Sequence, residues 1–137
     1  SEMCIRDRDK IDWTPYKGFV YTFDETKDIA WLYLVSDMLI TDYSSVMFDY
    51  SILNRPMLFF AYDLEDYKEN LRGFYFDFVN DIPGPISRDT DQLIKDIKEY
   101  NEDSWKEKYK NYHDKFNGID DGHASQKVID VIKKVSR

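Results

Sequence analysis

The sequence predicts an α/β fold in which a parallel, doubly wound sheet is flanked by helices. The short apolar runs 38–40 and 57–61 have the length and composition of buried strands. Residues 46–53 lie between them and are apolar on most faces, which is typical of a helix packed on a sheet. The helix should stop before Pro56, because a residue that precedes proline avoids the helical conformation. Strand, helix and strand in this order form a βαβ unit with a right-handed crossover.

The residues before this unit extend the same alternation. Residues 12–18 are rich in turn formers and predict a loop, whereas the β-branched and aromatic run 19–23 predicts a strand. Thr26 or Asp28 can cap a helix over 29–36. Strands and helices therefore alternate from about residue 19 onward, which favours a parallel sheet.

The rest of the chain predicts mainly helices and stiff loops. We expect a short helix within 62–72, and the aromatic and acidic run 74–78 fits either a short edge strand or an aromatic surface. Residues 81–86 should form a proline-rich loop that ends in extended structure. Three further helices are predicted after this loop. The first runs from Asp89 or Thr90 to about Tyr100, with Leu93, Ile94 and Ile97 on its inner face. The second runs from Ser104 to a left-handed turn at Asn117 and Gly118, and the third runs from about Gly122 to Val135 and buries Ala124, Val128, Ile129, Val131 and Ile132.

The chain divides into a short leading segment and one domain. Residues 1–8 have no hydrophobic periodicity and differ in composition from the rest of the chain, so we expect them to be foreign to the domain or the end of a truncated upstream region. Residues 9–137 then form a single partial α/β domain. The absence of methionine at position 1 also indicates a fragment of a longer protein.

The composition excludes several classes of protein. A formal net charge of −8 and a pI near 4.7 argue against nucleic-acid binding, which relies on basic patches. A single cysteine, Cys4, excludes an internal disulfide, and two histidines without a Cys/His cluster argue against a zinc site, so we predict neither a metal nor a cofactor. No apolar run is long enough to cross a bilayer and no secretory signal opens the chain, so we expect a soluble, intracellular domain.

The best candidate site in the sequence is the turn 42–45, where the first strand of the βαβ unit ends and its helix begins. Open α/β sheets bind ligands at this edge, and backbone N–H groups together with the helix dipole favour an anion there. Ser44 and Ser45 add two hydroxyl groups. The same serines also fit a plain helix cap, and the residue pattern alone favours that alternative.

A hydrolytic nucleophile at Ser44 is rejected, because its neighbours are Tyr43 and Ser45 rather than the glycines of a nucleophile elbow.

The residues around this turn resemble a known family. The run 36–49, SDMLITDYSSVMFD, is similar to the signature of the CDP-glycerol glycerophosphotransferases, which are polymerases and primases of wall teichoic acid synthesis in Gram-positive bacteria. The resemblance extends from about residue 18 to residue 123. It includes, in order and without long gaps, the motifs Arg55-Pro56, Ala61-Tyr62-Asp63, Leu71 to Phe78 and Pro83-Gly84-Pro85.

The resemblance implies a GT-B-like transferase built from two Rossmann-like halves, of which this chain matches the end of the C-terminal half with its helical C-terminus. By this resemblance Ser44, Ser45 and Asp49 line the CDP-glycerol site. The serine hydroxyls and the helix N-terminus can hold the donor pyrophosphate without a metal ion. We assign Asp49 to neutral hydroxyl groups of ribose or glycerol, because a carboxylate would repel a phosphate.

The chain departs from the family pattern in its histidines. The family's transfer chemistry relies on two histidines upstream of this region, one of them shortly before the predicted strand 19–23, where this chain has residues 1–8. His113 and His123 match no catalytic motif and are expected to be surface residues. We therefore predict no catalytic residue in this chain, and we expect it on its own to bind the donor weakly or not at all and not to turn over.

The resemblance also implies partners and a location. They are the CDP-glycerol donor, the N-terminal half of the same enzyme, and a lipid-linked acceptor held by parts outside this chain, with the parent enzyme peripheral at the cytoplasmic face of the membrane. The assembly state is left open, with a homo-oligomer among the alternatives. Arg72 could contact a phosphate, but pairing with the acidic residues of 63–69 is favoured.

Two other classes of function remain open from the residues alone. One is a flavodoxin-like or receiver-like module that binds an anion without chemistry, and the other is a structural half-domain whose Tyr- and Phe-rich surface docks on a partner. The order of motifs after residue 60 disfavours the first. The sequence does not separate a primase from a polymerase, or a glycerol donor from a ribitol donor.

Overall fold

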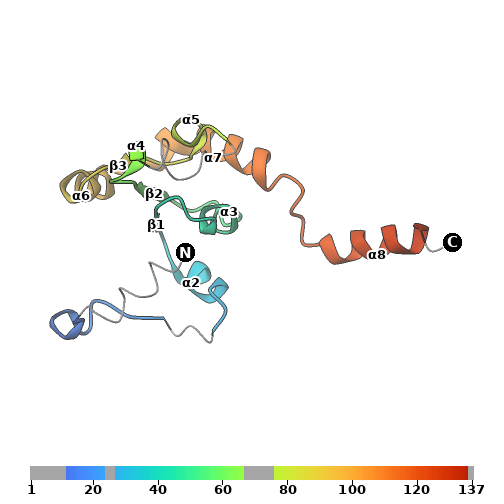
Figure 1. Ribbon diagram of the computed structural model, residues 1–137, viewed down its shortest axis with the longest axis horizontal. Helices are drawn as coiled ribbons and strands as arrows, with labels where there is room; N and C mark the ends of the chain where they lie inside the picture. Colours follow the sequence, from blue (N-terminus) through green and yellow to red (C-terminus); the bar gives the residue numbers. More distant parts are fainter. Residues whose placement is uncertain (1–11, 24–26, 67–75, 136–137) are drawn as a thin grey trace. The chain divides into compact units, whose positions relative to one another are not determined.

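The computed structural model describes residues 12–23, 27–66 and 76–135 (Figure 1). The chain divides into two compact units, residues 1–32 and residues 33–137, and each is described here by itself. In the first unit the described structure is a single 3₁₀ turn, η1 (Thr14–Tyr16), and the start of helix α2. The second unit contains the sheet and the remaining helices, which are α2 (Ala30–Val35, shared with the first unit), α3 (Val46–Ser51), α4 (Leu64–Asp66), α5 (Phe78–Asp81), α6 (Thr90–Glu99), α7 (Glu102–Phe116) and α8 (Ala124–Val135).

The sheet has three parallel strands in the order β1 (Leu39–Thr41), β2 (Met57–Phe60) and β3 (Ile86–Ser87). Leu39 pairs with Met57, and Phe59 pairs with Ile86. The β1–α3–β2 unit is the predicted βαβ unit, with each strand boundary within one residue of the expected one. The predicted α/β class with a parallel sheet and flanking helices is confirmed.

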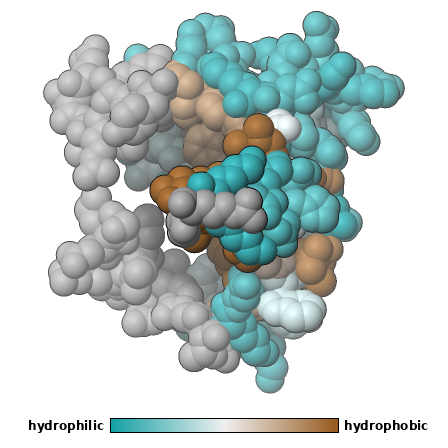
Figure 2. All heavy atoms as spheres, turned by 90° about the vertical axis from the view of Figure 1, so that its right-hand side faces the viewer, coloured by the Kyte–Doolittle hydropathy of each residue, from teal (hydrophilic) through white to brown (hydrophobic). Residues whose placement is uncertain are grey.

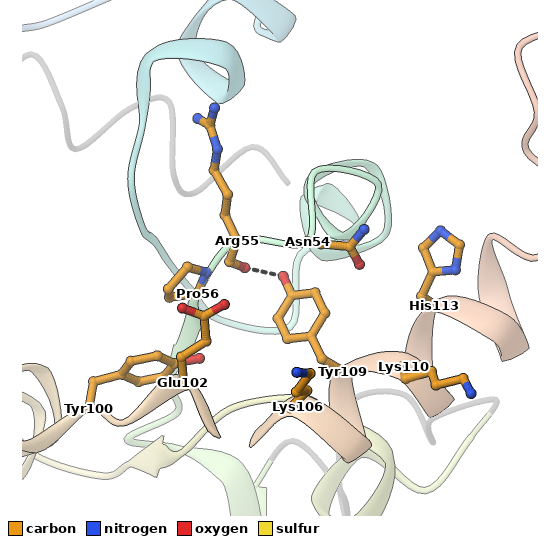
Figure 3. A pocket seen from close by; sticks show the side chains of 9 residues that line it. All are labelled: Asn54, Arg55, Pro56, Tyr100, Glu102, Lys106, Tyr109, Lys110 and His113. Atoms are coloured by element: carbon orange, nitrogen blue, oxygen red, sulfur yellow. Dashed lines mark hydrogen bonds between the residues drawn. The ribbon is translucent and has the colours of Figure 1, made fainter. Parts of the chain in front are cut away.

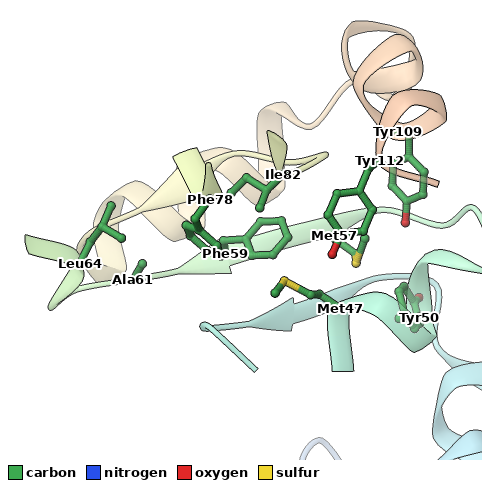
Figure 4. Close-up of a cluster of buried hydrophobic side chains, with 10 residues drawn as sticks. All are labelled: Met47, Tyr50, Met57, Phe59, Ala61, Leu64, Phe78, Ile82, Tyr109 and Tyr112. Atoms are coloured by element: carbon green, nitrogen blue, oxygen red, sulfur yellow. The ribbon is translucent and has the colours of Figure 1, made fainter. Parts of the chain in front are cut away.

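The central strand β2 lies in the middle of the hydrophobic core. Met57, Leu58 and Phe59 have no exposed surface, as expected for a strand with neighbours on both edges. Buried residues from α3, α5 and α7 pack in the same core cluster, as Figure 4 shows with Tyr50, Phe78 and Tyr112 among them. Aromatic rings connect α3 to α7, because Phe48 stacks on Tyr112 with ring centroids 5.9 Å apart and meets Phe116 at 5.1 Å.

Gly84 sets how closely the segment before β3 approaches β2. A Cβ atom at this position would lie 1.9 Å from the backbone oxygen of Met57, so only glycine fits. Pro85, the next residue, accepts a hydrogen bond from the N–H of Phe59 through its carbonyl oxygen at 2.9 Å. The predicted stiff loop that ends in extended structure is therefore confirmed, and its glycine has a packing role.

The predicted strand 19–23 is wrong. The only backbone pairing described there is an isolated bridge between Lys17 and Val20, and Phe19 and Tyr21 are 86% and 82% exposed. A β-branched and aromatic run forms a strand only when a neighbouring strand supplies backbone partners. In the described part of the chain the third strand of the sheet is instead β3, and none lies before β1.

Three predictions about helix ends or strand ends also need correction. Helix α7 begins before Ser104, because the Asn101 side chain accepts the N–H of Asp103 at 3.0 Å and caps the helix three residues earlier. Its C-terminal residue Asn117 has φ −122°, so the helix ends without the predicted left-handed residue. Of the two alternatives for 74–78, the edge strand is wrong in the described part, because Asp77 caps α5 and Phe78 is already helical, and the aromatic surface remains.

The apolar faces of α6 and α8 are more exposed than predicted. In α6, Ile94 and Ile97 are 44% and 38% exposed. None of the described residues of α8 is buried, and the exposed positions include Val128, Ile132 and Val135. Figure 2 presents a face on which apolar residues lie among hydrophilic ones. The periodicity of α8 predicts an amphipathic helix correctly, but no described residue covers its apolar side.

Candidate functional site

The turn between β1 and α3 is held mainly by Asp42. The Asp42 carboxylate accepts the N–H of Ser44 at 3.0 Å, and the Ser44 hydroxyl oxygen accepts the N–H of Val46 at 3.5 Å, a long contact for a hydrogen bond. Ser45 occupies the N-cap position but makes no side-chain cap bond. Its φ and ψ of −61° and −12° are already helical, whereas a capping serine needs an extended backbone. The cap interpretation therefore holds only weakly for Ser44, and it is wrong for Ser45.

The predicted site residues lie together at this turn. Ser44 is half-buried, while Ser45 and Asp49 are exposed. The carbonyl oxygen of Ser45 accepts the N–H of Phe48 at 3.0 Å, so the helical turn already includes Ser45. Residues four apart in a helix lie on one face, which places Ser45 and Asp49 on the same side of α3.

Helix α3 has six residues, fewer than the sequence predicts. Its dipole is therefore small, since the dipole is the sum of a few aligned peptide groups. An anion at this turn would depend chiefly on hydroxyl and backbone N–H donors rather than on the helix as a whole.

The turns after β1 and β2 are joined by a side-chain hydrogen bond at the same edge of the sheet. The Tyr43 hydroxyl donates to a carboxylate oxygen of Asp63 at 2.9 Å. Burial of the Tyr43 hydroxyl and its hydrogen bond to Asp63 raise the pKa of Tyr43 well above its usual value, so the phenol stays protonated. Nearby, Arg88 and Glu65 form an exposed ion pair at 3.0 Å.

A cavity of about 380 Å³ lies at the opposite edge, where β2 begins (Figure 3). Its walls come from the α3–β2 turn, the end of α6 and one side of α7. The lining residues are Asn54, Arg55, Pro56, Tyr100, Glu102, Lys106, Tyr109, Lys110 and His113. The cavity does not include any predicted site residue. The Tyr109 hydroxyl donates to the backbone oxygen of Arg55, and burial raises the pKa of Tyr109.

Arg55 lines this cavity with its backbone, but its guanidinium group points toward α2 (Figure 3). It donates to the backbone oxygens of Tyr33, Leu34 and Ser36 at 3.2, 2.9 and 2.7 Å. These are carbonyl groups at the C-terminal end of α2, which have no partner within the helix. The Arg55 side chain thus caps a helix and is not available to a ligand in the cavity.

The remaining candidates from the sequence add no catalytic group. His113 is half-buried on α7, 3.5 Å from Asp114, and His123 is exposed. Arg72 lies outside the described residues. Among the residues that the structure describes, no three His, Cys, Asp or Glu side chains are grouped so as to hold a metal ion, and none of the helices is long and apolar enough to cross a membrane.

Sequence reasoning did not find the Tyr43–Asp63 hydrogen bond. A usable signal was present, because both residues belong to motifs that carry the family resemblance and both closely follow adjacent parallel strands. The carboxyl ends of such strands meet at one edge, so side chains that follow them are expected to be neighbours.

The parallel α/β sheet with its flanking helices and the polar turn at the carboxyl end of β1 places the chain in the Rossmann-like class of folds. The chain belongs to the CDP-glycerol:poly(glycerophosphate) glycerophosphotransferase family, whose sequence model matches residues 5–134. The match includes the turn 42–45 and Asp49. The predicted family is thereby confirmed.

Curated relatives include both glycerol and ribitol enzymes. The chain is 44% identical over 128 residues to the teichoic acid poly(glycerol phosphate) polymerase of Bacillus subtilis strain 168, covering 92% of this chain and 17% of that protein. It is 44% identical over 121 residues to the teichoic acid glycerol-phosphate transferase of Staphylococcus aureus, with 87% of this chain and 31% of that protein covered. The teichoic acid poly(ribitol-phosphate) polymerase of Bacillus spizizenii is also 44% identical, with 85% and 18% covered.

Solved structures agree with this fold. The wall teichoic acid polymerase TagF matches with a TM-score of 0.82 and 42% identity over 95% of this chain and 32% of that one. A histidine variant of TagF soaked with CDPG matches with a TM-score of 0.80 and 43% identity over 92% and 32%. The chain thus spans less than a third of the polymerase structures it matches.

Proposed function

We propose that this chain supplies the donor-binding edge of a transferase that moves glycerol phosphate from CDP-glycerol to a lipid-linked teichoic acid acceptor. The observation that carries the proposal is the serine turn: Ser44 and Ser45 follow the carboxyl end of β1 in a chain that belongs to this family. Ligands of parallel α/β sheets bind at this edge. The TagF variant soaked with CDPG, which shares this fold, gives further support.

The residues of the turn suit a nucleotide diphosphate. The Ser45 hydroxyl makes no cap bond within the protein, so it can donate to a pyrophosphate oxygen. Ser44 adds a second hydroxyl, and no metal ion is required to hold the pyrophosphate. Asp49 is exposed on the same side of α3 as Ser45 and, as a carboxylate, would accept hydrogen bonds from the neutral hydroxyls of ribose or glycerol.

The transfer step needs a base that the described residues do not offer. The acceptor hydroxyl must lose a proton as it attacks the β-phosphorus of CDP-glycerol, and CMP leaves. His113 lines the cavity at the amino edge of the sheet, away from the end that carries the serine turn. The proposal therefore assigns the chemistry to histidines outside this chain. It is supported by the histidine variants among the TagF structures.

The same proposal assigns the acceptor to parts of the enzyme outside this chain. The parent enzyme would be peripheral at the cytoplasmic face of the membrane, where a lipid-linked acceptor and a soluble nucleotide donor can meet. In this arrangement the chain contributes donor binding, and the N-terminal half of the same enzyme contributes the base.

A ribitol-phosphate donor is the second candidate. It is favoured by the Bacillus spizizenii ribitol-phosphate polymerase and ribitol-phosphate primase, which are 44% and 41% identical to this chain. The two donors share CDP and differ only in the polyol. A pyrophosphate site at the serine turn would serve both, so the polyol must be read elsewhere. A flavodoxin-like or receiver-like module is disfavoured by the family membership.

The test is calorimetric titration of the full-length enzyme with CDP-glycerol, CDP-ribitol and CTP. Ser44→Ala/Ser45→Ala should weaken binding of the preferred donor by about 1–3 kcal/mol, because donors to a charged pyrophosphate are lost. The matched control is Ser104→Ala/Ser125→Ala, which removes two exposed hydroxyls elsewhere in the same unit. Unchanged binding in the Ser44/Ser45 variant would refute the donor site, and preference for CDP-ribitol would select the second candidate.

Asp49→Ala separates the two hydroxyl assignments. If Asp49 contacts ribose, binding of CDP and of CDP-glycerol should both weaken, by about 1 kcal/mol. If it contacts glycerol, only CDP-glycerol should be affected. Tighter binding of both ligands would mean that Asp49 faces the pyrophosphate and repels it, contrary to the proposal.

A further inference from the structure

The side chains of the two serines contribute little to holding the serine turn, since the one cap contact, from the N–H of Val46 to the Ser44 hydroxyl, is long at 3.5 Å. Asp42 fixes the backbone N–H of Ser44, but the Ser45 side chain makes no cap bond. A pair of hydroxyls that must hold a pyrophosphate needs a turn that is rigid before the ligand arrives, because ordering a loop on binding costs affinity. The question is what ties this turn to the rest of the sheet.

Tyr43 is the residue between Asp42 and Ser44, and it is anchored at both ends of its side chain. Its ring packs against Phe78 of α5 with centroids 5.5 Å apart and contacts the hydrophobic core. Its hydroxyl donates to Asp63, which lies just beyond the end of β2, at 2.9 Å. The bond joins residues 20 positions apart, so it connects the ends of two adjacent strands.

We infer that the Tyr43–Asp63 hydrogen bond is the positioning device of the donor site, which fixes the serine turn of β1 against the end of β2. Tyr43 and Asp63 act through Ser44 and Ser45 and need not touch the donor themselves. The inference rests on the proposed function, because it assigns the purpose of this bond to donor binding.

The ring of Tyr43 points into the core and its backbone is continuous with Ser44, so a shift of the ring or hydroxyl moves the serine backbone directly. An ordinary tyrosine is already protonated at physiological pH, and burial together with the Asp63 bond raises the pKa of Tyr43 further, so its hydroxyl remains a donor. Because both partners of the bond belong to the protein, the bond needs no ligand to form.

A structural tyrosine in the same unit provides a matched control. The Tyr50 hydroxyl donates to the backbone oxygen of Ser36 at 3.0 Å, a hydrogen bond of nearly the same length. Tyr50 lies on the same helix, α3, that follows the serine turn, and it is fully buried. Tyr50→Phe should lower the melting temperature without changing donor affinity.

The experiment measures CDP-glycerol affinity and transfer rate in the full-length enzyme. Tyr43→Phe keeps the ring and removes the hydroxyl donor. It should raise the dissociation constant by about 5- to 10-fold, less than the full worth of a hydrogen bond to a carboxylate, because the variant loosens the serine turn without removing a contact to the ligand. The rate at saturating donor should change less than about twofold, because no transition-state contact is removed. Asp63→Ala should have the same effect as Tyr43→Phe, and the double variant should be no worse than either.

Asp63→Asn is the conservative rescue. Its amide oxygen can still accept from the Tyr43 hydroxyl, so affinity should stay within about twofold of wild type, whereas a role for the Asp63 charge would make this variant as weak as Asp63→Ala. If Tyr43→Phe fails to fold, the Asp63 pair still decides the question, because Asp63 is only half-buried.

The outcomes separate this inference from the proposed function. Loss of binding in Ser44→Ala/Ser45→Ala together with unchanged affinity in Tyr43→Phe and Asp63→Ala would overturn the positioning role and keep the donor site. Additive effects of Tyr43→Phe and Asp63→Ala would also overturn it, since the two residues would then act separately. Unchanged affinity in the serine variant would refute the donor site itself.

Discussion

The two edges of the same parallel sheet differ in how their polar groups are engaged. At the carboxyl edge, Ser44, Ser45 and Asp49 are half-buried or exposed, and Ser45 makes no side-chain cap bond. At the amino edge, Gly84 and Arg55 make close contacts to backbone oxygens. A cavity of about 380 Å³ nevertheless lies at the amino edge. The cavity and the edge at which parallel α/β sheets bind ligands therefore lie at opposite ends of the strands, and the donor site proposed above follows the direction of the strands.

The contact at Gly84 should carry the largest effect on stability. Gly84→Ala places a methyl group 1.9 Å from the Met57 backbone oxygen, and the strand cannot retreat without breaking the adjoining bond from Phe59 to Pro85. We expect a loss of about 3 kcal/mol or more in the free energy of unfolding, or failure to fold. Thermal denaturation of the full-length enzyme measures this.

Gly122→Ala is the control for Gly84→Ala. Gly122 has φ +77° with no atom within 4 Å of a built Cβ, so the substitution adds backbone strain without a clash. Its cost should be about 1 kcal/mol. Equal losses for the two glycines would mean that backbone conformation, and not the approach of β3 to β2, explains Gly84.

Arg55 should carry the next largest effect, on stability and not on donor binding. Arg55→Ala removes the charged donor that the backbone oxygens of Leu34 and Ser36 have at 2.9 and 2.7 Å, while the Ser36 oxygen keeps its bond from Tyr50, so the loss should be about 2 kcal/mol. Arg55→Lys restores charge but not the forked guanidinium group, so it should recover only part of the loss. The melting temperature and the CDP-glycerol dissociation constant are measured on the same samples. A weakened donor affinity in the folded Arg55→Ala protein would contradict the division between the two edges.

The βαβ unit could be predicted from sequence because its signals are local. The signals are two apolar runs of strand length, a helix-like segment between them, and Pro56. They predict the ends of each strand and of the helix to within one or two residues of the observed ends. The helix at 90–99 was equally local, since Asp89 accepts the N–H of Gln92 at 2.8 Å as a capping residue should. Propensity and capping decide such elements without reference to the rest of the chain.

The errors concern features that depend on a partner. The run 19–23 has the composition of a strand but no neighbouring strand among the described residues, and α8 has an apolar face but no described residue against it. Periodicity states which side of an element is apolar, but not what covers it. Asn101 was missed because Ser104 also satisfies the capping pattern, and only the backbone angles decide between them.

The candidate site could be predicted only in part, because some of its features are local and others depend on a partner strand. Ser44 and Ser45 follow from the motif and the strand direction, and Asp49 follows from the motif alone. The structure places the serines at the predicted turn and Asp49 in the first turn of α3. Whether they bind the donor stays a prediction. The Tyr43–Asp63 bond was not predicted, because it depends on the pairing of β1 with β2 in addition to the motif.

The smallest expected effect concerns the cavity. Lys106 and Lys110 are exposed cations on α7 that line it, and they make the amino edge an alternative place for a pyrophosphate. We expect Lys106→Ala/Lys110→Ala to change the CDP-glycerol dissociation constant by less than about twofold and the stability by less than about 0.5 kcal/mol, because exposed lysines contribute little. The control variant is Lys133→Ala/Lys134→Ala on α8, which removes the same number of positive charges away from the cavity. It shows how much of any change in affinity comes from the net charge of the protein alone. A loss of tenfold or more that is specific to the Lys106/Lys110 variant would move the donor pyrophosphate to the amino edge, and the serine turn would then be only a structural turn.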